Sequence, residues 1–85
     1  MKAKLIIFPS EDGFHVVVWG TWTEGSMRTR SFDNRAEMIA LLENLHLISP
    51  AEAQELDEFT FLNSCPLYAA EIDKETLEAH GFRRA

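Results

Sequence analysis

Four consecutive large apolar residues, 16–19 (VVVW), lie between two clusters of turn-forming residues, 9–13 (PSEDG) and 23–26 (TEGS). A β-branched and aromatic segment between two such clusters is typical of a β-strand. Successive side chains of a strand point to opposite faces of the sheet, so a strand with one face in water alternates apolar with polar residues. The run therefore predicts a strand with apolar side chains on both faces, and both faces need a cover.

Two more strand-like segments flank this run. Residues 4–8 precede the first turn cluster, and residues 27–32 follow the second cluster and alternate in polarity. Strands separated by short turns are the pattern of an antiparallel meander. The sequence therefore predicts a three-stranded antiparallel β-meander of residues 4–8, 14–22 and 27–32.

Two helix starts follow the strands. Asp33 or Asn34 can cap a first helix, and Glu37 stands three residues after Asn34, as in a capping box. Ser49 is followed by Pro50 at the first helical position and by a glutamate three residues after the cap. The predicted helices cover residues 35–45 and residues 50 to between 56 and 59.

The last third of the chain predicts one more short strand and one more helix. Residues 67–72 can form the strand, and Asp73 can cap the helix. Gly81 supplies a left-handed helix end, after which the ring of Phe82 can fold back onto the helix. Residues 83–84 are expected to be a frayed tail.

These signals predict one small α+β domain over residues 1–85. We expect a three-stranded antiparallel β-meander packed against two to three short α-helices, with the possible fourth strand near residues 67–72. A chain of 85 residues buries a smaller fraction of its surface than a large one and is correspondingly marginal in stability. Additional burial in an oligomer would therefore matter.

The strand register decides which residues share a face. If residues 9–13 and 23–26 are loops, Phe8 faces Phe14 and Trp22 faces Met27. The first face then carries large apolar groups that pack against the first helix: Ile6, Phe8, Phe14, Val16, Val18, Trp22 and Met27, with Thr29 among them. The second face carries Leu5, Ile7, His15, Val17, Trp19, Thr21, Arg28, Arg30 and Phe32.

The second face is too apolar to be left in water. Exposing its five large apolar side chains would forgo roughly 7 to 15 kcal/mol, comparable with the stability of a whole domain. Three covers remain open: residues 59–68 folding back, a second copy of the chain, or a different protein, peptide or small ligand. The predicted partner interface is Leu5, Ile7, Val17, Trp19, Arg28, Arg30 and Phe32.

Composition excludes several functional classes. The 8 basic and 14 acidic residues leave a formal charge of -6, which argues against binding nucleic acid, because that affinity rests on Lys and Arg contacts to phosphates. The first apolar run is too short for a signal peptide or a membrane span. Cys65 is the single cysteine, so no disulfide framework is expected and a cytoplasmic location is favoured.

No residue pattern predicts catalysis, a cofactor or a metal. His15, His46, Cys65 and His80 are far apart in the sequence and form no close pair of metal ligands. An enzyme or small-ligand domain that uses Cys65 and a histidine stays an alternative.

Three arginines that lie close together in an otherwise acidic chain form a local cluster of positive charge. Arg28, Arg30 and Arg35 can bind an anion or an acidic partner, with Trp19 as a stacking neighbour. They can also pair with the surplus of acids in this chain or in a second copy, where exposed pairs contribute little. We favour pairing with the protein's own acids.

A family resemblance supplies an alternative function. The segment EDGF at a turn and the strand-to-helix segment SFDNRAEMIALLENL resemble the start of HicB-like antitoxin domains over less than half of the chain. The stretch WGTWTEGS stands where that family has a motif with proline and cysteine. The resemblance implies an antitoxin or a regulatory partner protein.

The sequence as a whole predicts a non-enzymatic protein that acts by association. We expect it to bind itself as a homodimer, or another protein, through the second sheet face.

Overall fold

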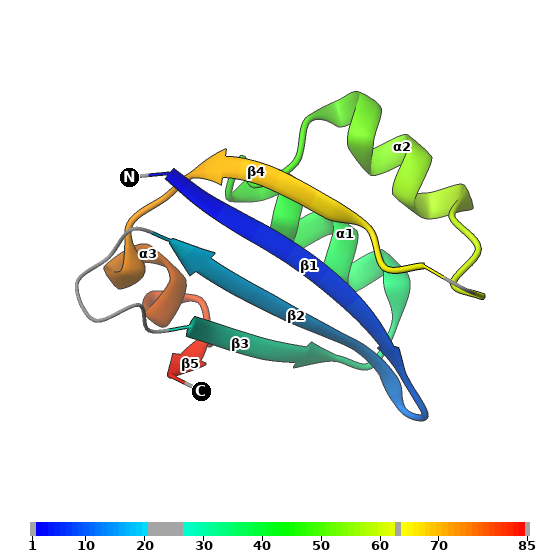
Figure 1. Ribbon diagram of the computed structural model, residues 1–85, viewed down its shortest axis with the longest axis horizontal. Helices are drawn as coiled ribbons and strands as arrows, with labels where there is room; N and C mark the ends of the chain where they lie inside the picture. The colour runs from blue at the N-terminus through cyan, green and yellow to red at the C-terminus, as the bar shows by residue number, and fades with distance from the viewer. Residues whose placement is uncertain (1, 21–26, 63, 85) are drawn as a thin grey trace.

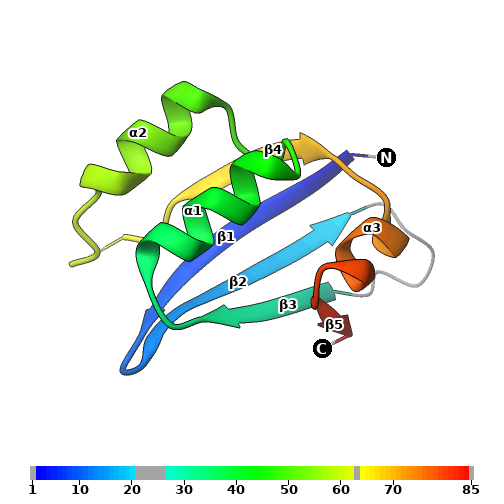
Figure 2. The ribbon, with the colours of Figure 1, turned by 180° about the vertical axis from the view of Figure 1, so that it is seen from behind.

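The computed structural model describes residues 2–20, 27–62 and 64–84. Over these residues the chain forms β1 (Lys2–Ser10), β2 (Gly13–Gly20), β3 (Met27–Phe32), α1 (Arg35–Asn44), α2 (Pro50–Glu58), β4 (Leu67–Glu71), α3 (Lys74–Ala79) and β5 (Arg83–Arg84). The strands make one antiparallel sheet in the order β4-β1-β2-β3-β5. Figure 1 looks onto the face of this sheet without helices, and Figure 2 shows the helices over the other face. The predicted α+β class is confirmed, with a wider sheet than the meander alone.

The hydrophobic core lies between the sheet and the helices. Its largest side chains with almost no exposed surface are Leu5, Ile7, Val16, Val18, Met38, Leu42, Leu47, Leu56, Leu77 and Phe82. They come from β1, β2, all three helices and the segments that follow α1 and α3. Apolar burial therefore ties the helix layer to one face of the sheet.

The starts of α1 and α2 are where the sequence predicts them. Asn34 Oδ1 accepts a hydrogen bond from the backbone N–H of Glu37 at 2.8 Å. Ser49 and Glu52 form a reciprocal capping box, and Pro50 occupies the first turn of α2. Asp73 stands at the N-cap position of α3, but its side chain makes no capping hydrogen bond.

The end of α3 confirms the predicted left-handed helix end at Gly81. Gly81 has φ 86° and donates to the carbonyl of Glu78, while Phe82 donates to the carbonyl of Leu77 at 3.0 Å and is buried. These two bonds define a Schellman motif. α1 ends in the same way at His46, which has φ 59° although it is not glycine.

The register between β1 and β2 differs from the prediction by one residue. The turn is Glu11-Asp12, with Ser10 opposite Gly13 and Phe8 opposite His15. A shift of one residue moves every side chain of a strand to the other face. The prediction for β1 was therefore wrong: Leu5 and Ile7 lie in the core, and Ile6 and Phe8 lie on the uncovered face.

The register between β2 and β3 also differs. Trp19 pairs with Met27, so Met27 and Thr29 lie on the uncovered face and not in the core. The placement of Arg28, Arg30 and Phe32 on the second face was likewise wrong, because their strand positions alternate with those of Met27 and Thr29. The predictions for Thr21, Trp22 and the turn at residues 23–26 lie outside the described residues.

The described part of residues 59–68 does not cover the second face. Phe59, Phe61 and Tyr68 pack against the core on the helix side. Leu67 begins β4, which extends the sheet beside β1. Residues 83–84 form β5 against β3, so the predicted frayed tail was wrong. Within the described residues, no helix has the length and apolar character needed to cross a membrane.

Candidate protein interface on the open sheet face

Strand pairing arranges the uncovered face in three rows that cross the sheet. We call this face the open face. The first row is Ala69, Lys4, Trp19 and Met27; the second is Leu67, Ile6, Val17 and Thr29; the third is Phe8, His15 and Ser31. The first two rows combine β4 with the three earlier strands, although both longer helices lie between β3 and β4 in the sequence.

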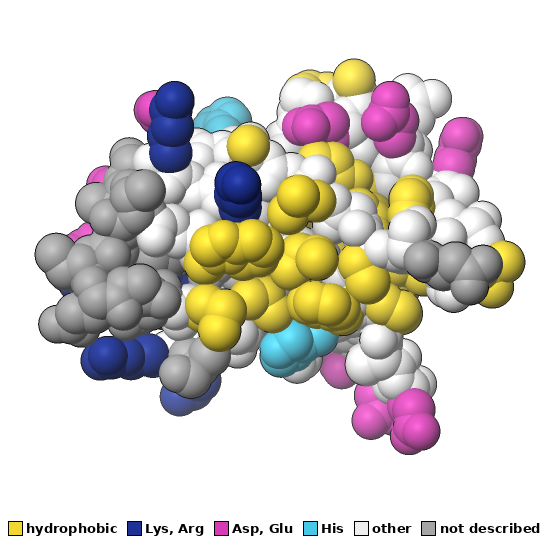
Figure 3. All heavy atoms as spheres, viewed as in Figure 1, with side chains coloured by type: hydrophobic (Ala, Val, Ile, Leu, Met, Phe, Trp, Pro, Cys, Tyr) yellow, Lys and Arg dark blue, Asp and Glu magenta, His cyan; other side chains and the backbone are white. Residues whose placement is uncertain are grey.

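The centre of the open face is apolar. Phe8, Met27 and Leu67 are 40%, 44% and 56% exposed, and Val17 and Trp19 are half-buried. Figure 3 shows hydrophobic side chains gathered in a patch over the middle of the sheet on this face. Contiguous exposed apolar patches on a protein surface often mark interaction sites.

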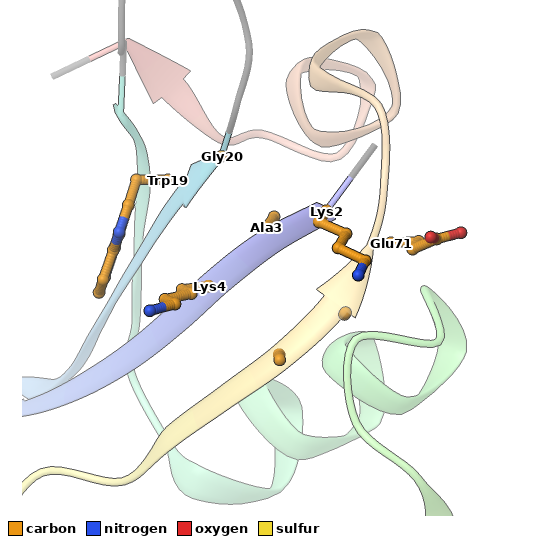
Figure 4. Close-up of a pocket in the computed structure, with 8 residues that line it drawn as sticks. Lys2, Ala3, Lys4, Trp19, Gly20 and Glu71 are labelled. Atoms are coloured by element: carbon orange, nitrogen blue, oxygen red, sulfur yellow. The ribbon is translucent and has the colours of Figure 1, made fainter.

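A shallow hollow of about 590 Å³ opens where β4, β1 and β2 lie side by side. In Figure 4, the side chains of Trp19 and Lys4 extend side by side from neighbouring strands, and Lys2 and Glu71 stand at the far end. The floor between them is made by small residues, among them Ala69 and Gly20. The hollow is therefore a continuation of the apolar patch with charged groups at its border.

Two of the predicted interface arginines are used inside the fold. Arg28 is only 5% exposed, and its Nε donates to Glu78 Oε2 at 3.0 Å. Arg30 donates to the backbone carbonyl of His80 at 2.8 Å and lies 4.5 Å from the ring centroid of Phe32. Both side chains therefore hold α3 and its C-terminal end against β3.

Arg35 holds the end of α2. Its Nη1 donates to the carbonyls of Leu56, Asp57 and Phe59 at 3.3, 2.8 and 2.8 Å. Its guanidinium also lies 5.5 and 5.4 Å from the ring centroids of two phenylalanines, Phe14 and Phe61. For the arginine cluster we favoured pairing with the protein's own acids. Arg28 makes such a pair with Glu78, whereas Arg30 and Arg35 donate to backbone carbonyls.

The open face thus keeps two of the seven predicted interface residues, Val17 and Trp19. Sequence reasoning missed Ile6, Phe8, Met27 and Leu67. A signal for β1 was present: Lys2 and Lys4 alternate with Ala3 and Leu5, which indicates that the lysine side of β1 faces water.

The histidines and the cysteine lie on separate elements. His15 is on the open face, where its Nδ1 is hydrogen-bonded to Ser31 Oγ at 2.9 Å. His46 and His80 end α1 and α3, and Cys65 is half-buried ahead of β4. In the part of the chain that the structure describes, no three or more His, Cys, Asp and Glu side chains are grouped to hold a metal ion.

Tyr68 lies on the helix side of β4 and has a perturbed acidity. Burial, together with the nearby carboxylates of Glu52 and Glu55, raises the pKa of its phenol above the ordinary value of 10.0. The folded state prefers the protonated phenol. Tyr68 therefore contributes its full stabilisation at pH values below the pKa that it has in the unfolded chain, and this stabilisation is lost as the pH rises through the pKa that it has in the folded protein.

We therefore expect Tyr68 to titrate above pH 10.0 in the folded protein. Tyr68 is the single tyrosine, so tyrosinate absorbance reports on it alone. Glu55→Gln should lower the midpoint, and Glu37→Gln on α1 is the matched control that should not. A folded midpoint equal to that of the urea-unfolded chain would contradict this expectation.

Comparisons with known proteins give no relative from which a role could be transferred. No family model, no curated protein and no solved structure matches this chain. The resemblance to HicB-like antitoxins stays a prediction.

Proposed function

We propose that this protein acts by association, binding a protein surface through the open face of its sheet. The observation that carries the proposal is the apolar patch on a sheet face that none of the described helices covers. It consists of Ile6, Phe8, Val17, Trp19, Met27 and Leu67. The exposed parts of these side chains would leave water when a partner covers the patch, and each Å² of apolar surface removed from water contributes roughly 25 cal/mol, so covering the patch favours association.

The make-up of the patch favours a protein partner. Protein interfaces are enriched in aromatic residues and methionine at their centre and carry a polar rim. Here Phe8, Trp19 and Met27 lie in the patch, with Lys2 and Glu71 at its border. An apolar sheet face can pack against a second layer about 10 Å away.

Charge and cysteine content support the same proposal. The formal charge of -6 disfavours a phosphate backbone as the partner. A single, unpaired cysteine suits a reducing compartment, so we place this association in the cytoplasm.

Site-specific photo-cross-linking tests the proposal. We expect p-benzoylphenylalanine in place of Phe8 to give light-dependent protein adducts in living cells, because Phe8 is exposed in the patch. The same group in place of Gln54, which is exposed on α2, is the control and should give none. Val17→Lys in the Phe8-labelled chain should abolish the adducts, since it puts a charge at the centre of the patch.

Equal cross-linking from positions 8 and 54, or adducts that persist with Val17→Lys, would overturn the proposal. The mass of an adduct identifies its partner as a second copy or another protein.

A further inference from the structure

We infer that the partner is a second copy of this chain, packed sheet against sheet about a two-fold axis that lies in the interface and runs perpendicular to the strands. This inference rests on the proposed function, because it uses the same open face. It adds the identity of the partner and the orientation of the two copies. Two features carry it: the distribution of charge along β1 and the pattern of the rows.

Opposite charges stand at the two ends of the hairpin formed by β1 and β2. Lys2 and Lys4 project from the first half of β1, and Glu11 and Asp12 form the turn at the other end. All four residues are exposed. In Figure 3, basic side chains stand toward the end where β1 begins, together with acidic ones, and acidic side chains stand beyond the turn. Glu71 faces Lys2 across β1 and β4, so Lys4 supplies the excess positive charge of that end.

This charge distribution selects one orientation of two copies. An axis parallel to the strands would place the basic end against the basic end and the acidic turn against the acidic turn. Like charges brought together across an interface are costly. An axis perpendicular to the strands places each lysine end beside the acidic turn of the second copy, twice by symmetry.

The three rows of the open face are also compatible with a two-fold axis that runs perpendicular to the strands. Rotation about the middle row brings Ile6 and Val17 against their own counterparts in the second copy. The row of Lys4 and Trp19 then faces the row of Phe8 and His15. This places an ammonium over an aromatic ring, a favourable cation–π arrangement, and keeps apolar groups against apolar groups.

The area of the open face sets the expected strength of the dimer. Strands of this length, spaced about 4.8 Å apart with a rise of about 3.4 Å per residue, give a flat footprint of roughly 450 Å² on each copy. Two copies would bury on the order of 1,000 Å² in total, which is the lower limit for a specific interface. We therefore expect a dimer that dissociates at micromolar concentrations.

Charge exchange tests the inference. In one variant the basic end is reversed (Lys2→Glu with Lys4→Glu), and in the other the turn is reversed (Glu11→Lys with Asp12→Lys). Sedimentation of the full chain should show concentration-dependent dimers for the wild type and at least tenfold weaker dimers for each variant. An equimolar mixture of the two variants should form heterodimers that are stronger than either homodimer, because each basic end then lies beside an acidic end again.

A matched variant separates the effect of charge pairing across the interface from the effect of the net charge of the chain. Asp57→Lys with Glu58→Lys changes the charge by the same amount as the turn variant, at exposed positions on α2. Mixed with the basic-end variant, it should not restore strong association. Circular dichroism confirms that each variant is folded.

The outcomes distinguish this inference from the proposed function. A wild-type chain that stays monomeric at millimolar concentration overturns the second copy as partner, while adducts from position 8 to another protein leave the proposed function standing. The proposed orientation is overturned if the charge reversals leave the dissociation constant of the dimer unchanged. It is also overturned if a mixture of the two variants does not favour heterodimers over homodimers. Absence of adducts from position 8 overturns the proposed function itself.

Discussion

Replacing Gly13 with alanine is expected to lower the free energy of unfolding by about 3 kcal/mol or more. Gly13 has φ 148°, a conformation that residues with a Cβ rarely adopt. A Cβ at this position would also collide with the backbone carbonyl oxygen of Phe32. Because Phe32 is buried in β3 and its carbonyl belongs to the backbone, no rotation of a side chain relieves the collision. Urea unfolding followed by circular dichroism measures the loss.

Gly81→Ala is the matched control for Gly13→Ala. Gly81 also has positive φ, 86°, but its Cβ would meet only the flexible side chain of Arg30, at an ordinary 3.5 Å. We expect a loss of about 1 kcal/mol, from the left-handed conformation alone. Equal losses for the two variants would show that the close approach between Gly13 and Phe32 does not constrain the hairpin.

Arg35→Ala is expected to destabilise the fold by about 3 kcal/mol. The guanidinium is a charged donor to three carbonyls at the C-terminal end of α2, where a positive charge also meets the negative end of the helix dipole. It lies against the rings of Phe14 and Phe61, which join β2 to the segment after α2. Removing it leaves carbonyls without their donor and separates α2 from the start of α1.

Two further variants isolate the role of the planar guanidinium. Arg35→Lys keeps the charge but loses the flat group that stacks on the rings, so it should recover less than half of the loss. Arg83→Ala removes an exposed arginine from β5 and should change stability by no more than about 0.5 kcal/mol. Thermal and urea unfolding rank the three variants. A loss for Arg35→Ala as small as that for Arg83→Ala would contradict the structural role of Arg35.

The helix ends could be predicted because their causes are local. The capping box of Ser49 involves residues three apart in the chain, and the helix stop at Gly81 needs only its own positive φ and the preceding turn. β4 was predicted for a similar reason, since Pro66 and Asp73 bracket a short apolar segment. Asp73 shows the limit of this reasoning: it stands at the cap position without using its side chain.

The candidate site could be predicted only in part. Val17 and Trp19 were placed correctly on the uncovered face because Val16 and Val18, in the same strand, alternate with them into the core. Residues on the neighbouring strands were misplaced because their face depends on where each turn begins and ends. The turn at residues 11–12 is two residues shorter on the β1 side and one residue shorter on the β2 side than the predicted loop, and this inequality reverses β1 relative to β2.

By itself, the sequence determined that the run of residues 16–19 carries two apolar sets, one for each face of the sheet. Strand geometry requires this, since neighbouring side chains point in opposite directions. Only the tertiary structure decided which residues of β1 and β3 join each set. The physical reason is that strand register follows from contacts between distant residues, such as the fit of Gly13 against the Phe32 carbonyl. The same distant packing turned Arg28 and Arg30 toward α3 and left Phe8, Trp19 and Met27 together on the open face.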